Sequence, residues 1–236
     1  EMHQYFCQTK PVVGQTYTLL KEQEHHAHHV LHLDHEVLRL VYDGKAFFAI
    51  ATVIDGQFQC FVEKEDLSVN ELEQEITLCM ALIRKEKFEW VLQKATELGV
   101  KKIVPFTSSR TIVKVQKEKE MKMKKRYGQI VLEASQQCKR NYIPEVLEVV
   151  YLDDLKNYQS EDNVVANETK HQEHMFFDLK TKKNTTIVIG PEGGFSSEEI
   201  VKLEKMGFRS ISLGNRILRA ETAAIFAVSV VAMKEI

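Results

Sequence analysis

Apolar and polar residues alternate in short runs over the first 70 residues. The runs QYFC, TYTLL, EVLRLVYDG, KAFFAIATVIDG and QFQCFVEKE are typical of strands, and Asp-Gly pairs at 43–44 and 55–56 predict tight hairpins. Strands of this length and spacing predict a small β-barrel over residues 1–70.

From residue 74 onward, short apolar runs alternate with segments of helical spacing. We expect strands at residues 77–83, 146–150, 163–166, 187–189 and 210–213 and in KKIVPF, with helices at 87–98 and 117–137. This alternation predicts a largely parallel α/β sheet over residues 74–236. The polar, acidic stretch at 68–74 marks the expected domain boundary.

One predicted strand runs into a glycine-rich turn, TTIVIGPEGGFSSEEI at residues 185–200. Ser196 and Glu199 have capping-box spacing, so a helix begins there. Glycines after the strand let a ligand approach the main chain without obstruction by Cβ atoms. The loop matches no phosphate-binding motif and carries the negative charge of Glu192, which disfavours a polyphosphate. A surface turn without a ligand is the alternative.

A second glycine-ended strand lies in ISLGNRILRAETAAI at residues 211–225. In parallel sheets, ligands bind at the carboxyl ends of the strands. Two such strands side by side would form a slot lined by main-chain groups, which suits a flat neutral ring such as adenine. Arg216 and Arg219 would add positive charge at the rim, or would pair with Glu192 or Glu221.

Composition narrows the class of protein. The chain has 236 residues, 44% apolar and 28% charged, as in globular domains. No apolar run reaches the roughly 18 residues of a membrane helix, and no signal peptide is recognisable. We therefore expect a soluble, cytoplasmic protein with no membrane partner. The four cysteines are dispersed, which fits reduced thiols and no metal site.

Charge is distributed unevenly along the chain, although the net charge is only −2. Residues 1–75 carry 5 basic and 13 acidic side chains, whereas residues 76–144 carry 16 basic and 6 acidic ones. Residues 145–236 carry 11 basic and 15 acidic ones. The basic middle segment predicts a polyanionic partner.

The two glycine turns also carry a family resemblance. IGPEGGFSSEEI and LGNRILRAETAA together resemble the C-terminal signature of the bacterial ribosomal RNA small subunit methyltransferase E family, in the SPOUT superfamily. KFEWVLQKATELGVKKIVPFTSSRTIVK and EASQQCKRNYIPEV resemble its middle motifs, and MHQYF and HHAHHVLHL its N-terminus. The resemblance covers nearly the whole chain and implies methylation of uracil N3 in 16S ribosomal RNA or the small ribosomal subunit.

The resemblance also implies a fold, a cofactor and an assembly. The fold would be a PUA-like β-barrel at residues 1–70 and a SPOUT α/β domain with a deep trefoil knot at 74–236. The cofactor would be S-adenosylmethionine, and the assembly a homodimer in which both subunits contribute to each site. The residues implied to bind the cofactor are Ala166, Glu168, Ile189, Gly190, Pro191, Glu192, Gly193, Gly194, Leu213, Gly214, Asn215, Ile217 and Leu218.

Methylation at N3 requires the imide proton to leave, and the base must first be unpaired because N3 lies on its Watson–Crick edge. Comparing the imide with a phenol of pKa about 10, lowering its pKa by two units needs about 2.7 kcal/mol of anion stabilisation. We predict that Arg219 provides it, with Glu221 or Glu192 as proton acceptor or orienting group.

Predicted RNA contacts lie mainly in the basic segment. They are His32, Arg110, Lys114, Arg126 and Arg140. Of these, Arg110 and Arg140 are expected to contact RNA directly. The lysine-rich helix at 117–137 either binds the RNA backbone or is a solvated face.

Six histidines between residues 25 and 35 invite a metal assignment. No carboxylate or thiolate accompanies them at ligand spacing, so we predict no metal and an RNA-facing surface instead. RNA affinity is then expected to fall as histidines lose protons above pH about 6.5. The family usually has arginine where this chain has His32, and glycine where it has His35 and Lys139.

Two other functions remain open from the sequence. One is a knotted methyltransferase acting on the ribose 2′-hydroxyl of RNA, which the LRAETAA segment disfavours. The other is a non-catalytic RNA-binding protein, which the two glycine loops disfavour.

Overall fold

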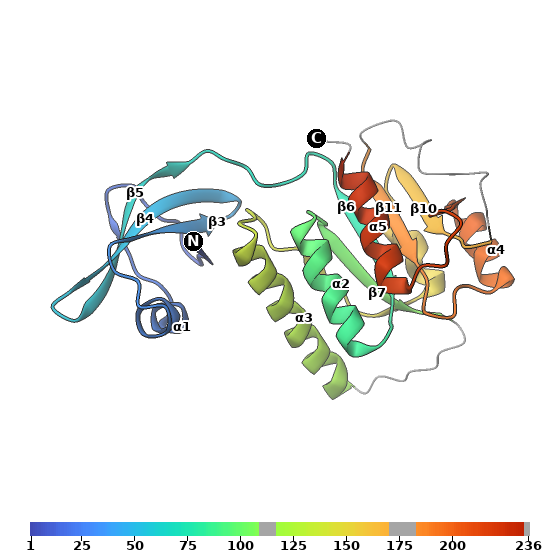
Figure 1. Cartoon of the computed structure of the whole chain (residues 1–236), viewed down its shortest axis with the longest axis horizontal. Coiled ribbons are helices and arrows are strands. Elements are labelled where there is room, and N and C mark those ends of the chain that lie inside the picture. The colour runs from blue at the N-terminus through green and yellow to red at the C-terminus, as the bar shows by residue number, and fades with distance from the viewer. Residues whose placement is uncertain (109–116, 170–182, 234–236) are drawn as a thin grey trace. The chain divides into compact units, whose positions relative to one another are not determined.

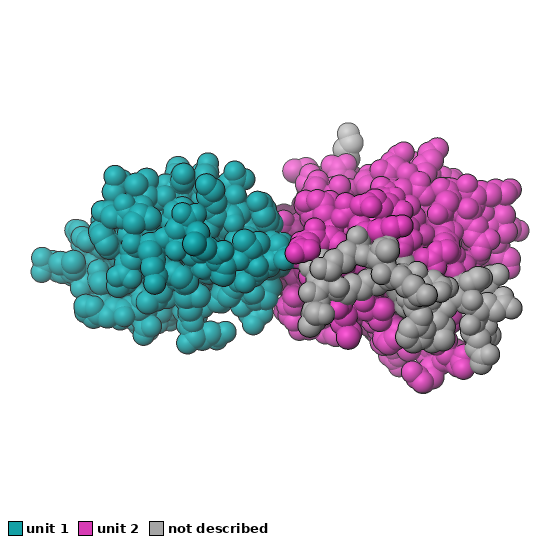
Figure 2. Space-filling view, turned by 90° about the horizontal axis from the view of Figure 1, so that it is seen from above, with its two compact units in different colours: residues 1–71, 135–142 teal, residues 72–134, 143–236 magenta. Residues whose placement is uncertain are grey.

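The computed structural model describes residues 1–108, 117–169 and 183–233 (Figure 1). The chain divides into two compact units (Figure 2). Unit 1 comprises Glu1–Glu71 and Ser135–Tyr142, and unit 2 comprises Leu72–Ala134 and Ile143–Ile236. The first division falls close to the boundary expected from the sequence. Ser135–Tyr142, expected in the second domain, belongs instead to unit 1.

Unit 1 contains a five-stranded sheet in the order β1-β3-β4-β5-β2. The strands are β1 (His3–Phe6), β2 (Thr16–Tyr17), β3 (Glu36–Tyr42), β4 (Lys45–Ile54) and β5 (Gln57–Asp66). β1 pairs with β3 in parallel, and the other pairs are antiparallel. Helix α1 (Lys21–His25) continues into the π-helical turn η1 (His26–Val30).

The two predicted Asp-Gly hairpins are confirmed. Asp43 and Gly44 join β3 to β4, and Asp55 and Gly56 join β4 to β5. All four residues have positive φ, between 45° and 77°. Hairpin turns of this kind match the twist of the flanking strands, and they favour Asp-Gly because both residues tolerate the left-handed region. One inward face of the sheet buries Leu38, Leu40 and Ala49.

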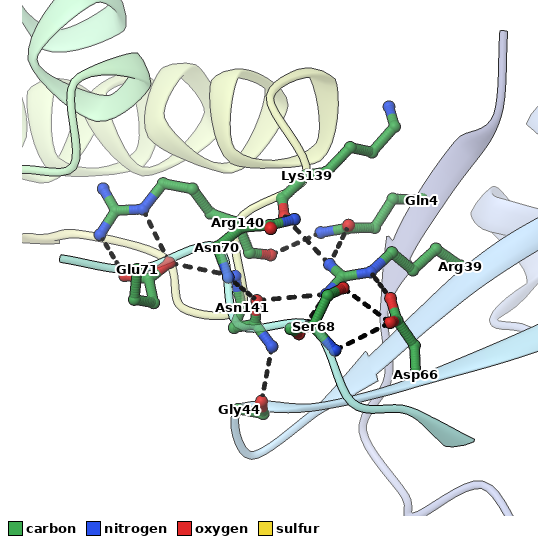
Figure 3. Close-up of polar contacts among 10 residues, drawn as sticks. All are labelled: Gln4, Arg39, Gly44, Asp66, Ser68, Asn70, Glu71, Lys139, Arg140 and Asn141. Atoms are coloured by element: carbon green, nitrogen blue, oxygen red, sulfur yellow. Dashed lines mark hydrogen bonds and ion pairs between the residues drawn. The ribbon is translucent and has the colours of Figure 1, made fainter. Parts of the chain in front are cut away.

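A buried arginine anchors Ser135–Tyr142 inside unit 1 (Figure 3). The Arg39 side chain is 1% exposed, and its Nε donates to Asp66 at 2.8 Å. Its four other N–H groups have acceptors in the same unit. They are the Gln4 side chain, the Lys139 and Ser68 carbonyls and the Asn141 side chain. A guanidinium has five donors, and all of them are satisfied here.

Unit 2 is built on a seven-stranded sheet. Its main order is β12-β10-β11-β6-β7-β8, with β9 also paired to β7. The strands are β6 (Ile76–Ala81), β7 (Lys102–Thr107), β8 (Glu145–Val146), β9 (Val150–Tyr151), β10 (Asp162–Ala166), β11 (Thr185–Ile189) and β12 (Arg209–Ile211). Every pair is parallel, so the predicted parallel α/β sheet is confirmed.

Helices cover both faces of this sheet. They are α2 (Lys85–Glu97), α3 (Lys117–Gln137), α4 (Ser197–Met206) and α5 (Ala220–Ala232), with the 3-10 helix η2 (Leu152–Tyr158). Leu78 and Met80 face a core shared with α2 and α5, whereas Cys79 faces one shared with α4 and η2. Figure 1 shows α2 and α5 in front of the sheet. No described helix is long and apolar enough to cross a membrane.

Candidate functional site

Three neighbouring parallel strands end together at one edge of the unit 2 sheet. β10 lies between β11 and β12, with Val165 opposite Val188 and Ala166 opposite Ile211. The chain leaving each strand therefore enters the same region. This is the edge at which parallel sheets bind ligands.

The loops after these strands enclose a cavity, and eleven of the thirteen predicted cofactor residues line it. They are Ala166, Glu168, Ile189, Gly190, Pro191, Glu192, Gly194, Leu213, Gly214, Ile217 and Leu218. Gly193 and Asn215 are not among the described residues that line it. Six residues outside the predicted cofactor set also contribute, namely Asn167, Phe195, Ile200, Arg216, Ala220 and Ala223. Arg216 had been placed at the rim, and the others adjoin predicted positions or lie in the helices that follow.

At two glycines in this wall an added Cβ would force a neighbouring side chain to move. A Cβ on Gly190 would lie 2.9 Å from the Phe195 ring. A Cβ on Gly194 would lie 2.6 Å from Oε1 of Glu168, and Gly194 also has φ +69°. At these two positions protein side chains, Phe195 and Glu168, lie against the main chain.

Hydrogen bonds hold the loops in place. Ser196 and Glu199 form the predicted capping box at the start of α4. The backbone N–H of Asn167 donates to the Ile211 carbonyl at 2.9 Å, which joins the ends of β10 and β12. Glu192 Oε1 accepts from the backbone N–H of Arg84 at 3.2 Å. The cavity wall is thus fixed by local caps and by bonds between loops.

The charged side chains that line the cavity are Glu168, Glu192 and Arg216. Two carboxylates and one guanidinium disfavour a polyphosphate and suit a ligand that carries both a positive charge and a carboxylate. The apolar residues Ile189, Leu213 and Leu218 can pack against a flat ring. This set of groups fits the sulfonium, amino-acid and adenine parts of S-adenosylmethionine.

The two predicted catalytic residues lie beside the cavity, at the start of α5. Arg219 is the exposed N-cap residue of α5, and Glu221 lies in its first turn. Neither is among the described residues that line the cavity. Lys87 Nζ lies 2.9 Å from Glu221 Oε1, a contact between α2 and α5 that the sequence did not reveal.

The charge state of Glu221 follows from these neighbours. Burial alone would raise the pKa of its carboxyl. The hydrogen bond from Lys87, the residue's own backbone N–H and the positive charges of Lys87 and Arg219 together outweigh that effect. The net result is a pKa below the ordinary value, so Glu221 is ionised at neutral pH.

The predicted RNA contacts have different surroundings. Arg110 and Lys114 lie outside the described residues. Arg126 is exposed and makes two hydrogen bonds to the Glu89 carboxylate, at 3.2 and 3.1 Å. His32 is exposed, with φ +53°.

Arg140 does not lie where the sequence prediction requires. Its side chain is 3% exposed and makes a bidentate contact with Glu71 within unit 1. Its carbonyl also accepts from the Gln4 side chain at 2.7 Å (Figure 3). Because the guanidinium is buried and already bound, the expected direct contact with RNA disagrees with the structure. Its role is to hold the Ser135–Tyr142 segment.

The histidines of α1 and η1 stack on one another. The rings of His28 and His29 are 4.3 Å apart, and those of His25 and His29 are 5.3 Å apart. His28 also stacks on Phe58, and His26 Nδ1 lies 2.8 Å from the Tyr5 hydroxyl. Within the described ranges, no group of three or more His, Cys, Asp or Glu residues is arranged to hold a metal ion.

Known proteins share this sequence pattern. Residues 70–232 match the family described as RNA methyltransferase domain. The ribosomal RNA small subunit methyltransferase E of Bacillus subtilis is 31% identical over 98% of this chain and 96% of its own length. That of Mesomycoplasma hyopneumoniae is 40% identical over 66% of this chain and 69% of its own. This chain belongs to the ribosomal RNA small subunit methyltransferase E family.

Solved structures support the same family. A methyltransferase of Legionella pneumophila in complex with S-adenosylmethionine has a TM-score of 0.88 and 33% identity, over 99% of this chain and 98% of that one. The ribosomal RNA small subunit methyltransferase E of Neisseria gonorrhoeae, also bound to S-adenosylmethionine, has a TM-score of 0.87 and 28% identity over the same shares. The small subunit methyltransferase E fold therefore extends over both units.

Proposed function

We propose that this chain methylates N3 of a uridine in 16S ribosomal RNA, using S-adenosylmethionine. Its family makes it a ribosomal RNA methyltransferase that depends on this cofactor. The position of the methyl group and the roles of individual residues form the proposal. The observation that carries it is the glycine-walled cavity with Arg219 and Glu221 at its edge.

The cavity supplies the binding groups for the cofactor. Its apolar side chains and the main chain at Gly190 and Gly214 receive the adenine ring, and Arg216 receives the carboxylate. Glu168 and Glu192 balance the positive charge. S-adenosylmethionine, when bound, supplies an activated methyl group on a sulfonium sulfur.

The residues at the start of α5 act on the RNA base. Arg219 is exposed, so its guanidinium can meet a base that arrives from solvent and can stabilise the anion formed as N3 loses its proton. Glu221 accepts a hydrogen bond from the imide N–H, orients the base and takes up the proton that N3 loses. Glu192 is the weaker candidate for that role, because its carboxylate already accepts from the Arg84 backbone.

The finer fold and the assembly are also part of the proposal. We infer that unit 1 is a PUA-like barrel and that the C-terminal segment of unit 2 forms a trefoil knot, as the resemblance implies. A homodimer is supported by large apolar side chains exposed on unit 2, among them Trp90, Phe226 and Met233. Helix α5 is apolar on nearly all sides, which is unusual for a helix that faces water.

RNA would be held by exposed basic residues. Of those described, Arg126 and His32 are proposed contacts, and Arg110 and Lys114 remain predictions from the sequence. Binding dominated by phosphates should weaken steeply between about 50 and 200 mM salt. The competing functions, ribose methylation and RNA binding without catalysis, are distinguished by the reaction product.

The decisive experiment uses labelled S-adenosylmethionine and small ribosomal subunits from a strain that lacks this methyltransferase. We expect label in 16S RNA, and nuclease digestion with mass spectrometry should place it on N3 of uridine. A methyl group on ribose would favour the first competing function, and no transfer with intact RNA binding would favour the second.

The variant Arg219→Ala tests the proposed role of Arg219. It should abolish methyl transfer and leave the affinity for S-adenosylmethionine within about two-fold. Transfer at a near wild-type rate would remove Arg219 from the mechanism.

A further inference from the structure

The contact between Lys87 and Glu221 joins two helices at the edge of the cofactor cavity. Lys87 belongs to α2 and Glu221 to α5, and both helices pack on the same face of the unit 2 sheet. The two side chains are 30% and 15% exposed, and the distance from Nζ to Oε1 is 2.9 Å. This is a partly buried ion pair, which differs from the many exposed pairs that contribute little to stability.

Only one oxygen of the Glu221 carboxylate is used. Oε2 is buried and has no hydrogen-bond partner among the residues that the structure describes. A buried acceptor without a donor costs about 1 to 3 kcal/mol, and more when it is charged. Such atoms are rare in native structures and indicate a missing partner. Oε2 therefore has no donor within the described part of the chain, and a donor from a bound molecule would satisfy it.

The position of Glu221 limits what that donor can be. Its neighbours in the same helical turn, Ala220 and Ala223, line the cavity. Arg219, the proposed anion-stabilising group, lies two residues before it. A donor group of the substrate base, held beside the transferred methyl, would lie within the region that Glu221 borders.

We propose that Lys87 is a positioning residue for methyl transfer, which holds Glu221 ionised and in one rotamer so that Oε2 can accept a hydrogen bond from the imide N–H of uracil. This inference rests on the proposed function and deepens it, because it explains how Glu221 is prepared for the substrate. Lys87 acts through Glu221 and does not itself contact the base.

A second Lys–Glu pair on the same helix provides a matched control. Lys94 and Glu97 are 3.0 Å apart and both side chains are 33% exposed. That pair is local to α2, whereas Lys87 reaches from α2 to α5. Replacing either lysine by methionine removes one charge from α2 and keeps a long side chain. A difference between the two variants therefore reports on the connection to Glu221.

Kinetics of the full-length protein give the first test. Lys87→Met should lower kcat about 10- to 100-fold, because a small misplacement of a group that orients the substrate costs rate on this scale. The dissociation constant for S-adenosylmethionine should stay within about two-fold. Lys87→Arg should recover most of kcat because it restores the charge, and Lys94→Met should leave kcat unchanged. Equal losses in Lys87→Met and Lys94→Met would overturn the proposal.

A second readout needs neither cofactor nor RNA. Carbon-detected NMR of labelled glutamate can follow the titration of Glu221, assigned with Glu221→Gln. In Lys87→Met the pKa of Glu221 should rise, because burial then acts without the opposing lysine. Lys94→Met should leave that titration in place. An unchanged pKa in Lys87→Met would contradict the proposed coupling even if activity were lost.

A double-mutant cycle separates this inference from the proposed function. If Glu221→Gln is fully active, Glu221 has no role in the reaction and the proposed function must be revised at that residue. If Glu221→Gln is impaired while Lys87→Met is fully active, only the role of Lys87 fails. If Lys87 acts only through Glu221, adding Lys87→Met to Glu221→Gln should cause little further loss of kcat. Additive losses would overturn the inference.

Discussion

The two units differ in which residues occupy the left-handed region of backbone space. In unit 1 five residues with side chains do so, namely His32, His35, Asp43, Asp55 and Lys139. In the described part of unit 2 the residues with positive φ are all glycines, namely Gly99, Gly194, Gly207 and Gly214. A side chain in this region costs about 1 to 2 kcal/mol. Unit 1 therefore accepts backbone strain that the described part of unit 2 avoids.

Contacts explain part of this difference. In unit 2, Gly194 and Gly214 line the cavity, where a side chain would occupy space needed by a ligand. In unit 1, the Lys139 side chain donates to the Gln136 and Gln137 carbonyls, and the Lys139 carbonyl accepts from Arg39. At Lys139 the side chain and a buried polar cluster hold the strained backbone, whereas the positive-φ positions that line the cavity of unit 2 are glycines. The following experiments test that contrast.

The largest effect is expected from the buried cluster of unit 1. Arg39→Met removes all five donors and leaves the Asp66 carboxylate buried without its cation, so unfolding should become easier by about 3 to 5 kcal/mol. The more exposed pair of Arg209 and Asp162, 3.4 Å apart with side chains 39% and 22% exposed, is the control. Arg209→Met should cost less than about 1 kcal/mol. Urea unfolding measures the free energy of unfolding of both variants, and hydrogen exchange in β3–β5 locates the lost stability. Similar destabilisation in the two variants would contradict the role of the cluster.

The pH dependence of stability gives a second test of the Arg39 cluster. Burial alone would raise the pKa of Asp66, but hydrogen bonds from Ser68 and Arg39 outweigh it and lower the pKa. A lowered pKa in the folded state means that this stabilisation is present above the unfolded-state pKa, near 4, and is lost as the pH falls through the folded value. In Arg39→Met, the stability lost on protonation of Asp66 should be smaller than in the wild-type protein. Unfolding in urea between about pH 2 and 7 would show it.

The second effect should appear in cofactor binding. Gly194→Ala places a Cβ against the Glu168 carboxylate and strains the backbone, so affinity for S-adenosylmethionine should fall at least about ten-fold, or 1.4 kcal/mol. Gly207→Ala carries a comparable penalty, with φ +107°, at the end of α4. It is the control, because Gly207 does not line the cavity. Calorimetric titration should show normal affinity in the control; equal losses would mean that strain alone is responsible.

Much of the cavity could be predicted from the sequence because its determinants are local. A strand ending on glycine and a capping box are recognised within a few residues, and parallel strands bring their ends to a common edge. Gly190, Gly193, Gly194 and Gly214 were predicted to line one slot; Gly190, Gly194 and Gly214 line it, and Gly193 is not among the described residues that do. The residues after β10 include no glycine that would indicate a binding loop. They were predicted to bind the cofactor only because of the family resemblance.

The long-range polar contacts could not be predicted in this way. Arg39 and Asn141 are 102 positions apart, and nothing local to either indicates the other. Arg140 was expected to contact RNA because family-like segments flank it, but its guanidinium is paired with Glu71 inside unit 1. Lys87 was overlooked for a similar reason, since its partner lies on another helix. Charge patterns predict partners for a segment, and they do not show which charges are neutralised internally.

The third prediction concerns Lys139, where the family usually has glycine. Its φ of +64° indicates that the backbone retains the conformation glycine would adopt. Lys139→Gly should relieve strain and stabilise unit 1 by up to about 1 kcal/mol, partly offset by the greater freedom of glycine in the unfolded chain. Lys139→Ala keeps the strain but loses the side-chain bonds, so it should destabilise. Urea unfolding distinguishes them, and a loss in both would mean that the side-chain bonds outweigh the strain.

The smallest changes in stability are expected at His35 and Asp55, two residues with positive φ but different side chains. His35, with φ +57°, lies 3.8 Å from the exposed Asp34 carboxylate, a contact too weak to offset much strain. His35→Gly should therefore stabilise unit 1 by about 0.5 kcal/mol. Asp55 lies in a hairpin turn, where aspartate tolerates this region, so Asp55→Gly should change stability by less than His35→Gly does. A larger gain at Asp55 would show that turn chemistry does not reduce the strain, and the contrast between the units would then rest on glycine content alone.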